Sequence, residues 1–64
     1  MSVHQDFIRD VEAFLERHRM APSAFGTRAL NDPTFVWELR RGRSPSGVII
    51  DRVRDFMTQQ EQAA

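Results

Sequence analysis

The chain has 64 residues, no cysteine and a formal net charge of zero. A chain of this length forms one small domain and buries only about 60% of the surface that its unfolded form exposes, which argues against a large active-site cavity. The absence of cysteine excludes disulfides, cysteine-based zinc sites and thiol chemistry. Because there is no long apolar run and no signal-peptide pattern, we expect a cytoplasmic protein that contacts no membrane.

Charge is distributed unevenly along the chain. Residues 1–16 hold four acids and one arginine, a net of −3, and residues 44–64 hold three acids and two arginines, a net of −1. The central range 17–43 holds six arginines and two acids, a net of +4. All nine cations are arginine, which suits bidentate contacts with phosphate or guanine, and which a GC-rich genome would also produce.

The first predicted helix runs from about Phe7 to His18. Its apolar side chains recur at spacings of one, three and four residues, the pattern of a helix with one face toward a core. Acids populate its early turns and Arg17 and Arg19 its end, as the helix dipole favours. The side chains expected to face the core are Phe7, Ile8, Val11, Phe14, Leu15 and His18.

A second, shorter helix is predicted from about Pro22 to Leu30. Proline cannot continue the first helix, but it suits the first turn of a new one. Phe25 and Ala29 would face inward. Asn31 suits the left-handed conformation that commonly ends a helix.

The third predicted helix covers residues 33–41. Asp32 is a favourable cap and Pro33 a favourable first residue, so only a very short joint would separate it from the second helix. Gly42 would end it. Its inward-facing stripe is Phe35, Val36 and Leu39.

The fourth helix is predicted from Pro45 or Ser46 to Met57, and the polar tail 58–64 is expected to fray because it has nothing to bury. Val48 and Ile50 lie outside its inward stripe. We expect them to be either dimer contacts or ordinary core residues under a loop. No segment shows the alternation of a strand, so the expected fold is all-α, with residues 1–57 as one domain. The inward stripe consists of Ile49, Val53, Phe56 and Met57.

The second and third helices have the spacing of a helix-turn-helix. Gly26 would be the small residue at the close crossing, and Val36 and Leu39 follow it by ten and thirteen positions. The stretch "FGTRALNDPTFVWELRRGRSPSGVIIDRVRDFM" resembles the DNA-binding domain of the λ repressor and Cro superfamily, the XRE family, above all in "LRRGRSPSGVIIDRVRDF". The likeness departs at the turn, where Leu30 and Asn31 replace the usual glycine, and no exposed Gln or Asn in the third helix suits an adenine contact.

The resemblance implies a small four-helix domain, with room for only a short version of the family's fifth helix, and a helix-turn-helix at about residues 22–41. It also implies a sequence-specific DNA-binding transcriptional regulator of bacterial or phage type, such as a repressor, with helix 33–41 in the major groove. A monomer with few phosphate contacts would bind weakly, so we expect a homodimer on double-stranded DNA. The residues expected at the DNA are Ser23, Thr27, Arg28, Thr34, Trp37, Glu38, Arg40, Arg41, Arg43, Ser44 and Ser46.

Other interpretations of these residues stay open. Trp37 would also serve to cover a small core. The arginines after Glu38 would also suit a solvated helix end, and Ser44 and Ser46 would also cap a helix. A protein-interaction module on the same fold, such as an antitoxin, an antirepressor or a polymerase adaptor, is the alternative function, with Trp37 as its anchor.

Catalysis is not expected, because no nucleophile stands at a recognisable spacing from a base and no nucleotide-binding motif is present. His4 and His18 are fourteen residues apart with no third ligand near them, so we expect no metal site and no cofactor.

Overall fold

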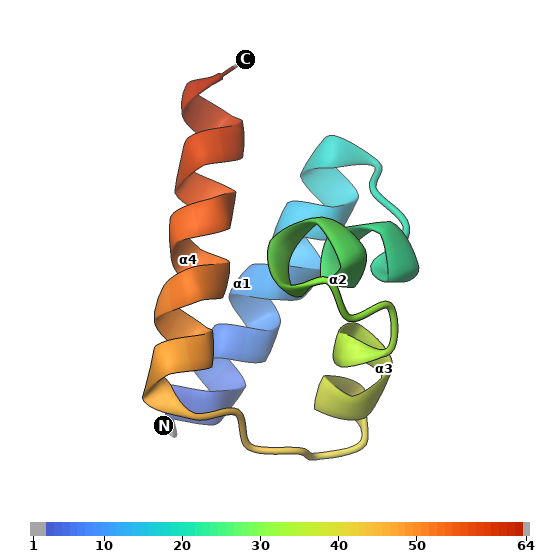
Figure 1. Ribbon diagram of the computed structural model, residues 1–64, viewed down its shortest axis with the longest axis vertical. Coiled ribbons are helices and arrows are strands. Elements are labelled where there is room, and N and C mark those ends of the chain that lie inside the picture. Colours follow the sequence, from blue (N-terminus) through green and yellow to red (C-terminus); the bar gives the residue numbers. More distant parts are fainter. Residues whose placement is uncertain (1–2, 64) are drawn as a thin grey trace.

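The computed structural model describes residues 3–63, which form four helices and no strand. In the view of Figure 1 the long helix α4 stands at one edge and the short helices α2 and α3 at the other, with α1 between and behind them. The all-α prediction is confirmed. The helices are α1 Val3–His18, α2 Pro22–Leu30, α3 Phe35–Arg40 and α4 Gly47–Gln62.

The core takes apolar side chains from all four helices. The rings of Phe14 and Phe25, and those of Phe25 and Phe56, meet edge to face with centroids 5.5 Å apart, so α1, α2 and α4 share one aromatic cluster. The predicted inward face is confirmed for α3 and for most of α1, where Ile8 and His18 are only partly buried. Ile49 and Phe56 of α4 are also partly buried. The buried residues are Phe7, Val11, Phe14, Leu15, Phe25, Phe35, Val36, Leu39, Val53 and Met57.

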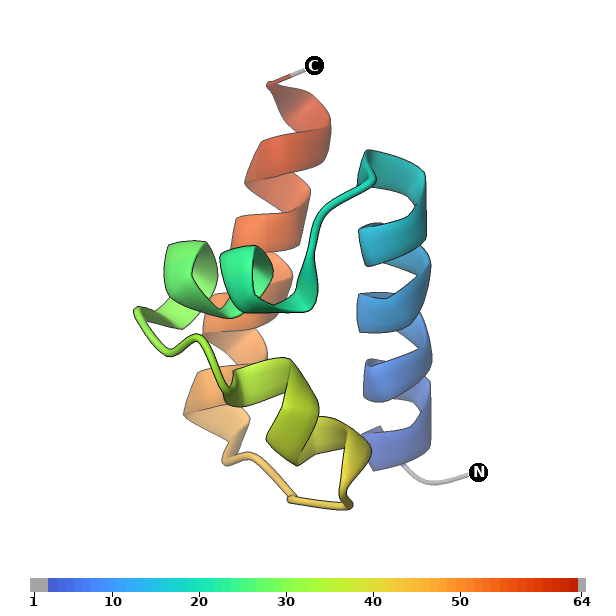
Figure 2. The same cartoon turned by 90° about the vertical axis from the view of Figure 1, so that its right-hand side faces the viewer.

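Two helices end at residues in the left-handed conformation. Arg19 has φ 50° just after α1, and Asn31 has φ 57° just after α2, as predicted for Asn31. Two bonds close the end of α2: the Asn31 N–H donates to the Thr27 carbonyl at 2.9 Å, and the Asp32 N–H donates to the Gly26 carbonyl at 3.1 Å. The first of these is the bond of the αL helix end, from the left-handed residue to the carbonyl four positions before it, and the chain turns sharply towards α3 (Figure 2).

The start of α3 differs from the prediction. The first residue of α3 is Phe35 and not Pro33, because residues 32–35 form a tighter turn in which the Phe35 N–H donates to the Asp32 carbonyl at 3.3 Å. Asp32 still acts as a local cap, since its carboxylate accepts from the Thr34 N–H at 3.1 Å.

The predicted fraying of the tail is wrong for most of its residues, and Ala64 lies outside the described residues. Helix α4 continues through Gln62, and Glu61 forms an ion pair with Arg17 near the end of α1. His18, which stacks on Phe14 with centroids 4.2 Å apart, lies 3.8 Å from the same carboxylate. Polar contacts with α1 therefore replace the apolar burial that the tail lacks.

Candidate nucleic-acid interface

The angle between α2 and α3 depends on a close backbone approach at Gly26. A Cβ added there would lie 2.1 Å from the backbone oxygen of Asp32 and 3.3 Å from the Cβ of Phe35. No larger residue fits without moving the turn, so glycine is needed for space. The sequence placed the small residue correctly, and its neighbour is the turn that leads into α3.

Trp37 lies on the outer side of α3, where 51% of its surface is exposed. The guanidinium carbon of Arg40 sits 5.0 Å from the centre of the indole, within the range of a cation–π contact. Trp37 does not complete the core, which leaves its role as a contact residue open.

Arg40 has a partner on α1. Its Nε and Nη2 atoms donate to the two carboxylate oxygens of Glu12, each at 2.7 Å, which is a bidentate ion pair. These hydrogen bonds lower the pKa of Glu12, against a smaller opposing effect of desolvation, and raise that of Arg40. Arg40 was expected at the DNA, and in the free protein its charge is already matched by a carboxylate.

Arg43 is also paired, through its Nη1 atom, with the carboxylate of Glu38. The pair offsets the one acidic side chain predicted on the DNA-facing side. Arg43 also lines an open cavity of about 250 Å³ between the α2–α3 turn and the start of α4, together with Asp32, Ser44 and Ser46. Two of the four arginines expected to meet phosphate thus have acidic partners within the chain.

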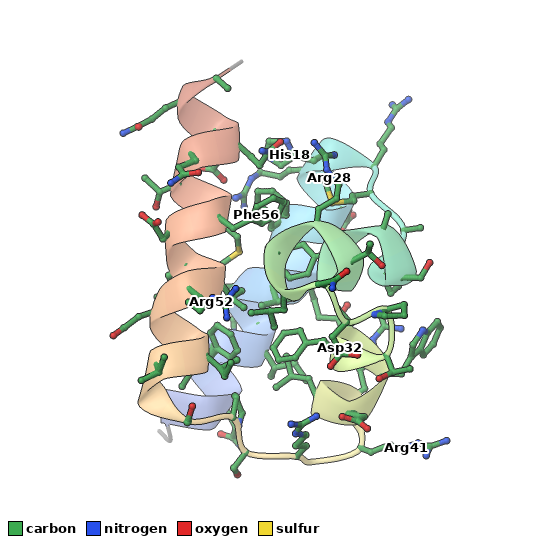
Figure 3. The ribbon with its side chains drawn as sticks, viewed as in Figure 1. His18, Arg28, Asp32, Arg41, Arg52 and Phe56 are labelled. Carbon is green, nitrogen blue, oxygen red and sulfur yellow. The ribbon has the colours of Figure 1, made fainter. Side chains whose placement is uncertain are left out.

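Arg28 and Arg41 are the other two. Neither has an ion pair with any residue in the range 3–63. Figure 3 shows Arg41 projecting away from the lower end of α3, whereas Arg28 lies towards the upper end of the molecule. The structure therefore does not bring these two arginines into one patch. Of the two, only Arg41 lies at the end of α3.

The predicted hydroxyl residues have different surroundings. Ser23, Thr27 and Ser44 are exposed, and the Ser46 Oγ caps α4 by accepting from the Ile49 N–H at 3.3 Å. Thr34 donates its hydroxyl to the Asp32 carboxylate at 2.8 Å, and this bond together with the Thr34 N–H lowers the pKa of Asp32. Thr34 and Ser46 thus have structural partners already.

The two candidates for a dimer contact are separated by their burial. Val48 is 69% exposed, whereas Ile50 is partly buried and packs against the core. Val48 therefore keeps the role of a surface contact, and Ile50 is mainly a packing residue.

Glu12 was not predicted to be part of this surface. Glu12 looked like an ordinary exposed acid of the first helix, and its partner Arg40 lies 28 positions away. No spacing rule links two helices across that distance, so only the tertiary structure brings the pair together.

Comparisons with protein-family models, with curated proteins and with solved structures find no match to this chain. No described helix is long and apolar enough to cross a membrane. Among the side chains that the structure describes, those of residues 5–63, no group of three or more His, Asp or Glu is arranged to hold a metal ion.

Proposed function

We propose that this protein is a sequence-specific DNA-binding transcriptional regulator of the helix-turn-helix type, with the outer side of α3 in the major groove. One observation carries the proposal: the Gly26–Asp32 contact fixes two short helices at a sharp joint and leaves the outer side of the second helix exposed. The sequence resemblance to the λ repressor and Cro domains adds to this support.

The residues on this side divide into two roles. Arg41, which is exposed and unpaired within residues 3–63, contacts phosphate. Trp37 lies against a thymine methyl group or a deoxyribose, since α3 has no side-chain amide that could form hydrogen bonds with an adenine edge. Glu38, with its charge offset by Arg43, can accept from a cytosine amino group at reduced cost in phosphate repulsion.

Affinity depends on how many arginines are free to contact phosphate. The pair of Arg43 with Glu38 is exposed, and such pairs are worth only about 0.2–1 kcal/mol, so DNA competes with it at small cost. A monomer still has few strong contacts. Two copies on paired half-sites therefore form the binding unit, with the exposed Val48 as the first residue to test at their contact.

The test is a selection of bound sequences from a randomised duplex library, followed by anisotropy titrations at several salt concentrations. Loss of one phosphate contact in Arg41→Ala should reduce the slope of log affinity against log salt by about 0.9. The matched control is Arg19→Ala, which removes an exposed arginine of the α1–α2 joint and should leave that slope unchanged. No enriched sequence and no binding at low salt would refute the proposal.

The exposed Trp37 also favours a second candidate, a protein-interaction module on the same fold. Tryptophan is among the residues most often found at the energetic centre of protein interfaces. A stoichiometric protein partner that is lost in Trp37→Ala, combined with no DNA binding by the intact chain, would establish this function in place of the first.

A further inference from the structure

A carboxylate, a guanidinium and an indole form a chain from α1 to the outer side of α3. Glu12 binds the Nε and Nη2 atoms of Arg40 at 2.7 Å each, and the guanidinium carbon of Arg40 lies 5.0 Å from the centre of the Trp37 ring. Trp37 and Arg40 are three residues apart on one helix, so their side chains are neighbours on its surface.

Glu12 determines which part of Arg40 is available to the ring. A carboxylate that takes the Nε–Nη2 edge in a fork leaves the flat face of the guanidinium to contact an aromatic ring. An arginine side chain without that anchor has several rotatable bonds and loses entropy when it settles on one surface. A fixed Arg40 also restricts the directions open to the indole above it.

We propose that Glu12 is a positioning residue for the candidate interface: it holds Arg40 against Trp37 and so sets the direction in which the indole is presented. Arg40 then acts mainly as a support for Trp37 and not as a phosphate ligand. The positioning itself is a property of the free protein, and only its use in DNA recognition rests on the proposed function.

The same helix provides a matched control. Asp10 of α1 pairs with Arg54 at 2.9 Å, and the Arg54 guanidinium carbon lies 5.4 Å from the centre of the Phe7 ring. Both arrangements consist of an α1 acid, an arginine from another helix and an aromatic ring. Only the Glu12 arrangement ends at the tryptophan, so Asp10→Asn removes an equivalent pair without touching the proposed support.

Trp37 is the single tryptophan of the chain, so its fluorescence reports this site alone. The test measures acrylamide quenching and time-resolved anisotropy of the indole in the free protein, with circular dichroism to confirm that each variant is folded. In Glu12→Gln the ratio of indole in contact with Arg40 to indole free of it should fall about two- to five-fold. That factor corresponds to the free energy of an exposed cation–π contact. Quenching should increase, the ring should reorient faster, and Asp10→Asn should match the unmodified protein.

Arg40→Met removes the guanidinium but keeps an unbranched chain, and should produce the same changes. Its combination with Glu12→Gln should add nothing, since both variants break one chain of contacts. Unchanged quenching and anisotropy in Glu12→Gln, or full additivity in the double variant, would overturn the proposal.

The role in recognition is tested separately on duplex DNA. Glu12→Gln and Arg40→Met should both weaken binding to the selected sequence more than to other sequences. The salt slope should stay unchanged in Arg40→Met, because no phosphate contact is lost, whereas Arg41→Ala should reduce it by about 0.9. A reduced slope in Arg40→Met would contradict the support role. Failure of the chain to bind any DNA would remove the proposed function and leave the fluorescence result standing.

Discussion

The two joints on either side of α3 are built differently. The α2–α3 joint, residues 31–34, packs its backbone against Gly26, and four hydrogen bonds hold it closed. They join the groups of Gly26, Thr27, Asn31, Asp32 and Thr34. The α3–α4 joint, residues 41–46, is also closed by backbone bonds, from the Gly42 N–H to the Leu39 carbonyl and from the Arg43 N–H to the Glu38 carbonyl, each at 3.1 Å. A Cβ on its Gly42, however, would meet nothing within 4 Å. The first joint is therefore fitted so closely that it excludes a side chain at Gly26, whereas the second joint leaves space around its glycine.

The largest effect is expected for Gly26→Ala. The new methyl group would lie 2.1 Å from the Asp32 carbonyl oxygen, and that oxygen belongs to the backbone, so the whole α2–α3 joint must move. The expected loss is about 3 kcal/mol or more in the free energy of unfolding, which chemical denaturation would measure. A variant with unchanged stability would show that the first joint is not the rigid one.

Gly42→Ala should have a smaller effect, and for a different reason. The space around Gly42 is open, but its φ of 99° is a conformation that a side chain disfavours. A loss of about 1–2 kcal/mol is expected, measured by the same denaturation. Gly42→Asn is the control, because asparagine tolerates positive φ better, and it should lose less than the alanine variant. Equal losses in the two variants would contradict this account.

The sequence predicts the local features of this molecule better than the contacts between its helices. Local signals placed the joint residues well: Gly26 at the close crossing, Asn31 as the left-handed helix end, and the buried stripe Phe35, Val36 and Leu39. These depend on neighbours within one or two turns, which a sequence pattern records directly.

What the sequence did not predict depends on contacts between distant helices. The pairing of Glu12 with Arg40 and that of Arg17 with Glu61 join α1 to α3 and to the end of α4. The first gives a carboxylate partner to an arginine that was expected at the DNA, and the second holds the polar tail of α4 against α1. Ion pairs between long flexible side chains leave no periodic trace in a sequence.

Gly47, directly after the second joint, should accept alanine without loss of stability. A Cβ there would meet nothing within 4 Å, and the residue begins α4. Alanine restricts the unfolded chain and favours the helix, so stability should rise by up to about 1 kcal/mol. For a domain of this size that corresponds to a gain of about 4–8 °C in Tm per kcal/mol, measurable by thermal unfolding. A decrease would mean that the second joint is as tightly fitted as the first.

The smallest effect concerns Asp32, whose carboxylate belongs to the first joint. The hydroxyl and then the N–H of Thr34 lower its pKa below the ordinary value of 3.8. Because the folded state has the lower pKa, the stability from these bonds is fully present above that ordinary value and is lost as the pH falls through the folded pKa. Asp32→Asn keeps an oxygen acceptor but cannot titrate. Its deficit in Tm should therefore be visible at pH 7 and should shrink in acid.

Thr34→Val separates the two causes of the Asp32 shift. It removes the hydroxyl donor at 2.8 Å and keeps the N–H at 3.1 Å. The pKa of Asp32, followed by NMR titration, should rise towards its ordinary value in this variant without fully reaching it. If it did not move, the N–H alone would be responsible for the shift, and the first joint would owe its closure to the backbone and not to the threonine side chain.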